Sequence, residues 1–362
     1  MLEGMDVRVA ILTGASKARE RREALAGIAD GSIDLLIGTH ALIEDRVQFS
    51  NLGFVVIDEQ HRFGVEQRAR LWTKNEQPPH ILVMTATPIP RTLAMTLYGD
   101  LDVSVIDELP PGRQPIRTVH YTDAARLRLF GFMRQEIKKG RQIYVVYPLI
   151  KESETMDYKD LQDGYEAISR DFPLPEYVTT ICHGKMKPED KEESMRQFKS
   201  GEANIMVATS VIEVGVDVPN ATVMVIESAE RFGLSQLHQL RGRVGRGSEQ
   251  SYCILMSGEK LSKEARLRLE AMCETNDGFR LAELDLKLRG AGDVNGTLQS
   301  GMAFDLKIAN PTLDSQILTV TREAAAEVLT ADPTLTQNGH EGLRELRKRY
   351  SGREEIDFSQ IS

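Results

Sequence analysis

The chain has 362 residues, of which 41% are hydrophobic and 27% charged, so wholesale disorder is excluded. Lys and Arg number 45 against 54 Asp and Glu, and the net charge of −9 excludes a protein that is basic all over, though not a local basic track. The length predicts roughly two or three domains. The cysteines lie far apart without a CxxC pair, which argues against a zinc site or a disulfide scaffold and favours a reduced setting (Cys182, Cys253, Cys273). Because no apolar run approaches the roughly 18 residues of a membrane span and no signal-peptide pattern is visible, we expect a soluble intracellular protein.

Short β-rich apolar runs alternate with segments of helical periodicity over residues 1–112. We predict strands at Val7–Leu12, Ile33–Gly38, Phe54–Ile57, His80–Met84 and Val103–Ile106, and helices at Lys17–Ala29, Val65–Trp72 and Pro90–Tyr98. Runs such as Gly53–Ile57 are apolar on both faces, which is typical of parallel strands covered on both sides. The alternation predicts a doubly wound α/β domain.

A second α/β domain is predicted over residues 113–260, after the proline-rich stretch Pro110–Pro115. Its strands are expected at Arg117–Tyr121, Gln142–Tyr147, Tyr177–Ile181, Asn204–Ala208, Thr222–Ile226 and Ser251–Met256, and its helices at Ala124–Lys139, Pro188–Lys199 and Ser235–Arg243. The acidic stretch Lys151–Asp171 is interpreted as a solvated helix or loop.

Residues 261–362 carry mostly helical periodicity. It continues from Leu261 to about Lys287, and a glycine-rich turn region follows from Arg289 to Gly301. Further helices are predicted at Asp314–Leu329 and Glu341–Tyr350.

Two adjacent carboxylates, Asp58 and Glu59, follow the apolar strand Phe54–Ile57. The exit of a buried parallel strand is where such folds bind ligands. In phosphate-handling motors the first acid holds Mg²⁺ and the second orients or activates the attacking water. An ordinary pair of solvated acids is the alternative.

Three arginines separated by glycines and a valine lie in Gln239–Gly247. Arginine binds phosphate bidentately, so two of them are candidate arginine fingers for a γ-phosphate. A basic surface patch is the alternative. It does not explain the glycine in Arg-Gly-Arg, which weakens a helix and adds no packing contacts.

Two other strands are followed by small hydroxyl residues. Met84–Arg91 suits hydrogen bonds that connect a nucleotide site to another surface, but a helix N-cap by Thr87 explains part of the pattern equally well. In Ala208–Asp217, Thr209 and Ser210 suit a nucleic-acid backbone, while Gly215 and Asp217 are expected to face a cleft.

Taken in order, these four stretches resemble motifs II, III, V and VI of superfamily 2 helicases. From Val7 to about Gly301 the chain most closely resembles the RecG family of bacterial branch-migrating DNA helicases. The resemblance rests on Asp58–Arg68 (DEQHRFGVEQR), Thr85–Thr92 (TATPIPRT), Glu108–Arg113 (ELPPGR) and Gln239–Arg246 (QLRGRVGR), with smaller matches at Thr13-Gly14 and Gly38–Leu42. The coupling factor Mfd is the nearest confusable family; it usually has Glu in place of Gln60.

The resemblance implies tandem RecA-like parallel-sheet domains, the first incomplete, followed by a helical coupling segment. It implies that Asp58 holds Mg²⁺, that Glu59 is the base, and that Gln60 and His61 couple the ATP site to the domain interface. From the second domain, the site would be completed by Gly215, Asp217, Arg243 and Arg246. Roles in DNA contact or coupling fall on Thr13, Gly14, Gly38, Thr39, Thr85, Thr87, Thr209, Ser210, Gln239, Arg289 and Gln299.

The coupling hairpin of the family resembles Arg289–Gly292 and Gly296–Gly301. One departure lies within it, because Leu298 stands where the family commonly has Arg. One expected charged contact is therefore absent. A glycine-rich surface loop is the alternative.

The sequence contains no Gly-x-x-x-x-Gly-Lys-Ser/Thr; its one Gly-Lys pair, Gly184-Lys185, precedes Met186. We therefore expect the chain to be the carboxyl-terminal part of a RecG-like protein, inactive alone, whose P-loop and wedge domain lie upstream.

The complete protein would couple ATP hydrolysis to branch migration of Holliday junctions and regression of stalled forks in DNA repair and recombination. The implied partners are branched DNA and single-stranded-DNA-binding protein, for a monomer at the bacterial nucleoid in the cytoplasm. A non-catalytic DNA- or partner-binding module, an Mfd-like translocase and an RNA helicase are the alternatives.

Overall fold

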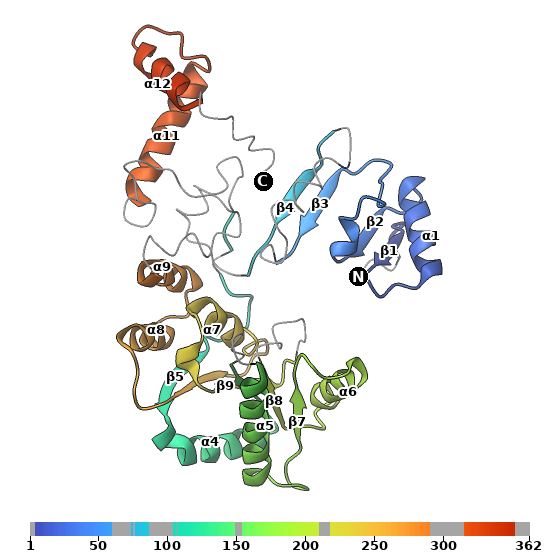
Figure 1. Cartoon of the computed structure of the whole chain (residues 1–362), viewed down its shortest axis with the longest axis vertical. Helices are drawn as coiled ribbons and strands as arrows, with labels where there is room; N and C mark the ends of the chain where they lie inside the picture. Colours follow the sequence, from blue (N-terminus) through green and yellow to red (C-terminus); the bar gives the residue numbers. More distant parts are fainter. Residues whose placement is uncertain are drawn as a thin grey trace. The chain divides into compact units, whose positions relative to one another are not determined.

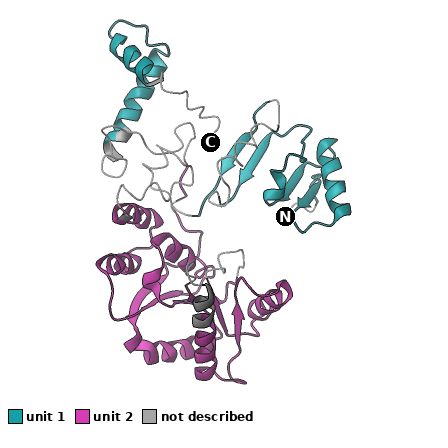
Figure 2. Ribbon diagram, in the orientation of Figure 1, with its two compact units in different colours: residues 1–86, 91–103, 290–362 teal, residues 87–90, 104–289 magenta. Residues whose placement is uncertain are grey.

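The chain divides into two compact units in the computed structural model (Figure 2). Unit 1 comprises residues 1–86, 91–103 and 290–362, and unit 2 comprises residues 87–90 and 104–289. The structure describes residues 4–59, 74, 77–86, 104–106, 108–148, 154–209, 218–289 and 315–351. The predicted domain boundaries at 112/113 and 260/261 stay predictions.

Unit 2 is built on a parallel sheet that helices surround (Figure 1). The sheet has six strands in the order β5-β10-β9-β6-β8-β7. The strands are β5 (Arg117–Thr122), β6 (Gln142–Tyr147), β7 (Thr179–Cys182), β8 (Ile205–Thr209), β9 (Ala221–Ile226) and β10 (Tyr252–Ser257). All six were predicted to within two residues at each end. The α/β prediction is confirmed here.

Helices cover both faces of this sheet. One layer consists of α4 (Arg126–Lys138) and α5 (Glu154–Asp171), and the other of α6 (Pro188–Lys199), α7 (Leu234–Arg241), α8 (Lys263–Glu274) and α9 (Gly278–Arg289). Alternate residues of β6 enter the two cores: Ile143 packs with the first layer and Tyr144 with the second. Parallel strands covered on both sides are apolar throughout for this reason.

The acidic segment Lys151–Asp171 is less solvated than predicted. Residues 154–171 form α5, and Leu161 and Ile168 are 1% and 2% exposed in the core beneath it. These residues lie two turns apart on one helical face, so the charges occupy the remaining faces. The interpretation as a solvated loop is wrong, and that as a helix is right.

Unit 1 contains two parallel strand pairs. β1 (Val9–Leu12) pairs with β2 (Leu35–Gly38), and β3 (Phe54–Ile57) pairs with β4 (His80–Val83). Helix α1 (Ala18–Ala29) packs Ile28 against Leu12 in the core of the first pair.

One face of each strand pair in unit 1 has no cover among the residues that the structure describes. Phe54 and Val56 are 59% and 51% exposed, while Ile57 is buried. The described residues therefore do not supply the second cover that was predicted for Gly53–Ile57. A strand that is apolar on both faces predicts that other segments pack on both faces of its sheet. The pattern does not identify which segments these are.

One further difference lies at residues 104–106, and the helices at the end of the chain agree with the prediction. The strand predicted at Val103–Ile106 is absent at residues 104–106, where Ile106 is 93% exposed. The helices predicted at Val65–Trp72 and Pro90–Tyr98 lie outside the described residues. At the end of the chain, α11 (Ser315–Ala331) and α12 (Glu341–Ser351) form as predicted. Within the described ranges, no helix is long and apolar enough to cross a membrane.

Candidate functional site

The acidic pair lies directly after β3 in unit 1. Asp58 is exposed and Glu59 is partly buried. The Glu59 backbone has φ of 52°, a left-handed conformation that non-glycine residues seldom adopt, and its N–H donates to Asp58 Oδ1 at 2.8 Å. The chain therefore turns immediately after the strand, at the acidic pair itself. Strained backbone of this kind often occurs at functional sites.

Other predicted residues of unit 1 also follow strand ends. Thr13 follows β1, where its N–H donates to Ser16 Oγ at 2.9 Å, and Thr39 follows β2. Thr39 and Asp58 line one cavity, so the ends of β2 and β3 lie near each other. Thr85, just beyond β4, is exposed.

Gly38, a predicted DNA-contact residue, is required by packing. An added Cβ would lie 2.1 Å from the Leu12 carbonyl oxygen of the paired strand. At Gly14, by contrast, nothing lies within 4 Å of an added Cβ. The glycine at position 38 thus has a structural explanation that is independent of DNA.

In unit 2, the predicted Gln239 lies on α7, and Arg243 and Arg246 follow the helix. Both arginines and Gln239 are partly buried, while Val244, between the arginines, is 2% exposed and packs in the core. Gly245 has φ of 78°, and an added Cβ would lie 2.9 Å from Ile116 Cγ1. Val244 and Gly245 therefore fix the loop that carries the two arginines.

Arg241, the first arginine of this motif, has a separate role. It is 2% exposed and donates from Nη1 to the carbonyl oxygens of Met272 and Thr275 at 3.0 and 2.8 Å. Its Nη2 lies 3.1 Å from His238 Nδ1. Since Arg241 joins α7 to the end of α8, its function in this structure is to hold the unit together.

Other predicted site residues are buried or lie outside the described part of the chain. Thr209 is 0% exposed at the end of β8, so its hydroxyl is not presented at the surface for nucleic acid. Arg289 is the last residue of α9, and its side chain is outside the description. The residues wholly outside it are Gln60, His61, Thr87, Ser210, Gly215, Asp217 and Gln299.

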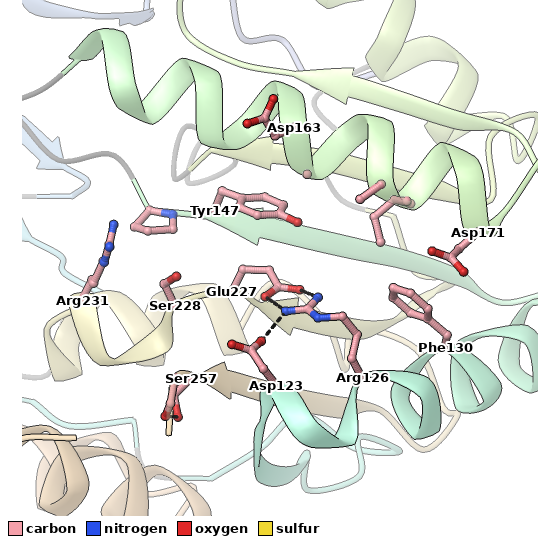
Figure 3. Close-up of a pocket in the computed structure, with 15 residues that line it drawn as sticks. Asp123, Arg126, Phe130, Tyr147, Asp163, Asp171, Glu227, Ser228, Arg231 and Ser257 are labelled. Carbon is pink, nitrogen blue, oxygen red and sulfur yellow. Dashed lines mark hydrogen bonds and ion pairs between the residues drawn. The ribbon is translucent and has the colours of Figure 1, made fainter. Parts of the chain in front are cut away.

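A pocket of about 380 Å³ in unit 2 was not predicted from the sequence (Figure 3). Arg126 donates to both Glu227 oxygens at 2.7 and 2.9 Å and to Asp123 at 2.7 Å, and these contacts raise the pKa of its guanidinium. Burial raises the pKa of the Tyr147 phenol, and the Glu227 carboxylate adds to the shift. Because Arg126 already pairs with both acids, the cluster ties α4 to the end of β9. The available signal was Glu227 itself, an acid directly after a buried strand.

The acidic turn fits a divalent metal of the kind that nucleotide sites use. Mg²⁺ is commonly held by one or two carboxylates together with water and substrate phosphates. Asp58 offers an exposed carboxylate at a strand end. No group of three or more His, Cys, Asp or Glu side chains in the described ranges forms a complete protein cage.

Three family models match the chain: "DEAD/DEAH box helicase" over residues 1–96, "Helicase conserved C-terminal domain" over residues 126–248, and "ATP-dependent DNA helicase RecG, domain 3, C-terminal" over residues 275–362. Curated relatives extend the match. The ATP-dependent DNA helicase RecG of Synechocystis is 52% identical over 94% of this chain and 41% of its own length. That of Bacillus subtilis is 50% identical over 92% of this chain and 48% of its own length.

The chain is homologous to the RecG helicases. A solved structure of RecG bound to a three-way DNA junction is 43% identical, with a TM-score of 0.66, and matches 88% of this chain and 40% of that one. These matches confirm the resemblance and the RecA-like fold class. The chain spans about half the length of the curated RecG relatives named here.

A more distant structure, the helicase Lhr of Mycobacterium smegmatis, shares the fold at 17% identity, with a TM-score of 0.52 and coverage of 73% of this chain and 37% of that one.

Proposed function

We propose that these residues form the motor portion of an ATP-dependent DNA helicase that acts on branched DNA. The complete protein would drive branch migration of Holliday junctions and regression of stalled forks, in repair and recombination at the bacterial nucleoid. The observation that carries the proposal is the 43% identity to a RecG bound to a three-way DNA junction. The RecG-specific match over residues 275–362 favours this family over an Mfd-like translocase or an RNA helicase.

In the proposed chemistry, ATP and Mg²⁺ supply the transferable phosphoryl group and the charge that stabilises it. Asp58 would be the metal ligand, and Glu59 would orient or deprotonate the attacking water. The exposed Asp58 carboxylate and the left-handed turn at Glu59 support this division of roles. Gln60 and His61 would couple this site to the domain interface.

Arg243 and Arg246 would stabilise the charge that develops on the phosphates. Their loop is fixed by the buried Val244, which supports a positioned guanidinium rather than a mobile surface charge. Gly215 and Asp217 would belong to the same nucleotide site. DNA contact is proposed for unit 1 at Thr13, Gly14 and Thr39 and for unit 2 at Gln239.

The chain on its own should not hydrolyse ATP at a DNA-dependent rate. The P-loop pattern supplies the amide cradle and lysine for the β- and γ-phosphates, and the sequence contains no such pattern. Steady-state ATPase assays with forked DNA, on the chain and on its Glu59→Gln variant, test this. DNA-stimulated turnover that disappears in the variant would mean that another segment provides the cradle.

The active form can be tested in a chimera in which these 362 residues replace the matching part of the Bacillus subtilis relative. Arg246→Ala in the chimera should lower DNA-stimulated ATP turnover by on the order of 10³-fold while DNA binding is kept. Lys260→Ala, an exposed cation on the same unit, is the matched control. Turnover within a few-fold of the parent would remove Arg246 from the site.

A second candidate is a non-catalytic DNA- or partner-binding module, favoured by the missing P-loop pattern. If the chimera also lacks ATPase activity but the chain alone binds forked DNA, this candidate replaces the motor.

A further inference from the structure

The pocket in Figure 3 lies where the connections of the unit 2 sheet diverge. Strands β6 and β9 are neighbours in that sheet. After β6 the chain passes to α5 on one face, whereas after β9 it passes to α7 on the other. Tyr147 at the end of β6 and Glu227 directly after β9 both line the pocket. In parallel α/β sheets, a divergence of this kind at the carboxyl ends of the strands is where ligands bind.

The pocket has the size and access of a small-molecule site. Its volume is about 380 Å³, and such sites commonly occupy roughly 300–1,000 Å³. Both α4 and α5 contribute lining residues, so we call it the α4–α5 pocket. Its lining includes Asp123 and Asp163, which are exposed, so a ligand can enter from solvent.

Two locally unfavourable backbone positions line the pocket. Gly164 lies inside α5, where an added Cβ would lie 2.3 Å from Tyr147 Cζ. Glycine inside a helix is destabilising relative to alanine, and here it leaves room for the tyrosine ring. Ser228, directly after β9 and Glu227, has φ of 47°, a left-handed conformation of the kind that clusters at functional sites.

Acidic groups outnumber basic ones in the pocket. Arg126 is already engaged, since it donates to both Glu227 oxygens and to Asp123. The carboxylates of Asp163 and Asp171 form no ion pair or hydrogen bond with the part of the chain that the structure describes. The lining therefore attracts cations and repels phosphates. It contains four carboxylates and two guanidiniums (Asp123, Asp163, Asp171, Glu227, Arg126, Arg231).

The pocket also has an aromatic and aliphatic lining. Phe130 and Tyr147 contribute rings, and Ala167 and Ile168 of α5 contribute aliphatic groups. Figure 3 shows both rings in the same view as the Arg126–Glu227 ion pair. Ammonium groups bind favourably over aromatic rings, and methylene groups gain from contact with apolar side chains. The lining therefore suits a ligand that combines positive charge with hydrocarbon.

We propose that the α4–α5 pocket binds a linear polyamine, a chain of methylene groups that carries ammonium groups at intervals. The ammonium groups would pair with Asp163 and Asp171, and the methylene groups would contact Ile168 and the two rings. None of the residues proposed for ATP or DNA lines this pocket. The proposal is therefore independent of the proposed motor function.

Isothermal titration calorimetry of the purified chain with spermidine, at an ionic strength of about 0.15 M, tests the proposal. We expect saturable one-to-one binding with a Kd below about 1 mM. Hexaamminecobalt(III) has the same charge as spermidine but no hydrocarbon, so it should bind about tenfold more weakly or less. Hydrogen exchange should slow in α4 and α5 when spermidine is added, which locates the site.

Variants separate binding in the pocket from the overall acidity of the chain. The double variant Asp163→Asn/Asp171→Asn should weaken spermidine binding about fivefold or more, because two ion pairs are lost. Asp190→Asn/Glu192→Gln removes the same charge from exposed positions on α6 and should bind within about twofold of the parent. Ala167→Phe places a ring in the pocket without changing its charge and should also weaken binding about fivefold or more. Circular dichroism and unchanged exchange in β8 and β9 check that each variant is folded.

The proposal is wrong if spermidine shows no saturable binding up to about 1 mM, or if the pocket and α6 double variants bind it equally. Equal affinity for hexaamminecobalt(III) would also overturn it, because charge alone would then explain the binding. A tetralysine peptide is the remaining comparison, since a lysine side chain offers the same ammonium group. Slower exchange in α4 and α5 with this peptide but not with spermidine would mean that the pocket receives a protein side chain instead.

Discussion

Residues close together in one motif differ sharply in environment. Arg241 is buried and binds the carbonyls that end α8, whereas Arg243 and Arg246 are only partly buried beyond the helix end. Arginine has no acceptor, so the contact between Arg241 Nη2 and His238 Nδ1 requires that the imidazole nitrogen accept. His238 is therefore neutral in this arrangement.

The neutral His238 makes the stability of unit 2 depend on pH. Burial, aided by the adjacent Arg241 charge, lowers the pKa of His238 from 6.5 to about 4. Between these values the unfolded chain binds a proton that the folded chain does not, so the free energy of unfolding falls as the pH decreases. Above pH 6.5, neutral His238 makes its full contribution to the free energy of unfolding of unit 2. By pH 4, that free energy has fallen by about 3 kcal/mol.

His238→Gln isolates this effect because the amide oxygen can still accept from Arg241 but does not titrate. Urea denaturation at pH 7 and pH 4.5, with unit 2 followed by hydrogen-exchange mass spectrometry of β8 and β9, gives the two free energies of unfolding. The parent should lose more stability than the variant across this interval. Equal losses would show that His238 is protonated in the folded chain or that other groups govern the response.

At the scale of the element, the β1–β2 pair of unit 1 depends on close backbone approach at Gly38. Gly38→Ala should destabilise the β1–β2 pair by about 2–3 kcal/mol, because the new Cβ would lie 2.1 Å from a backbone oxygen that cannot rotate away. Gly14→Ala, at the open turn after β1, should change stability by no more than about 0.5 kcal/mol. The measurement is exchange of the β1 and β2 amides.

The two glycines were both predicted to contact DNA, so the pair also tests that assignment. If Gly14→Ala lowers fork binding in the chimera while the fold is unchanged, a DNA role is supported at position 14. Equal exchange rates in the Gly38→Ala variant and the parent would contradict the packing explanation for position 38.

Sequence patterns located the six strands of unit 2 but did not predict the contacts between its elements. A strand buried on both faces, such as β9, has an apolar run that locates it, and the proline-first pattern located α6 at Pro188. Nothing in the spacing of QLRGRVGR distinguishes the buried Arg241 from its two neighbours, because burial depends on where α8 ends. The Arg126–Glu227 pair joins residues 101 positions apart, a separation that local patterns do not bridge.

At the scale of the whole molecule, the two compact units each carry part of the proposed chemistry. Asp58 and Glu59 belong to unit 1, and Arg243 and Arg246 belong to unit 2. The proposed motor would need both sets, so we expect the segments that connect the units to take part in coupling ATP hydrolysis to DNA movement. One of these connections begins where α9 ends at Arg289, since residues 290–362 are grouped with unit 1.

Arg289 is therefore the position at which a coupling role can be separated from catalysis. In the chimera, Arg289→Ala should leave DNA-stimulated ATP hydrolysis within about twofold but reduce fork unwinding by at least about tenfold. The reason is its place: it ends the last helix of unit 2 and opens the Arg-Gly-Ala-Gly stretch, which has no phosphate-binding pattern of its own.

Arg280→Ala, an exposed arginine near the start of the same helix, controls for loss of one positive charge on α9 and should affect neither activity. Parallel measurements of ATP turnover and unwinding on one fork substrate decide the matter. If both rates fall together in Arg289→Ala, the residue acts in hydrolysis or folding, and the transmission of motor closure must be sought elsewhere in residues 290–362.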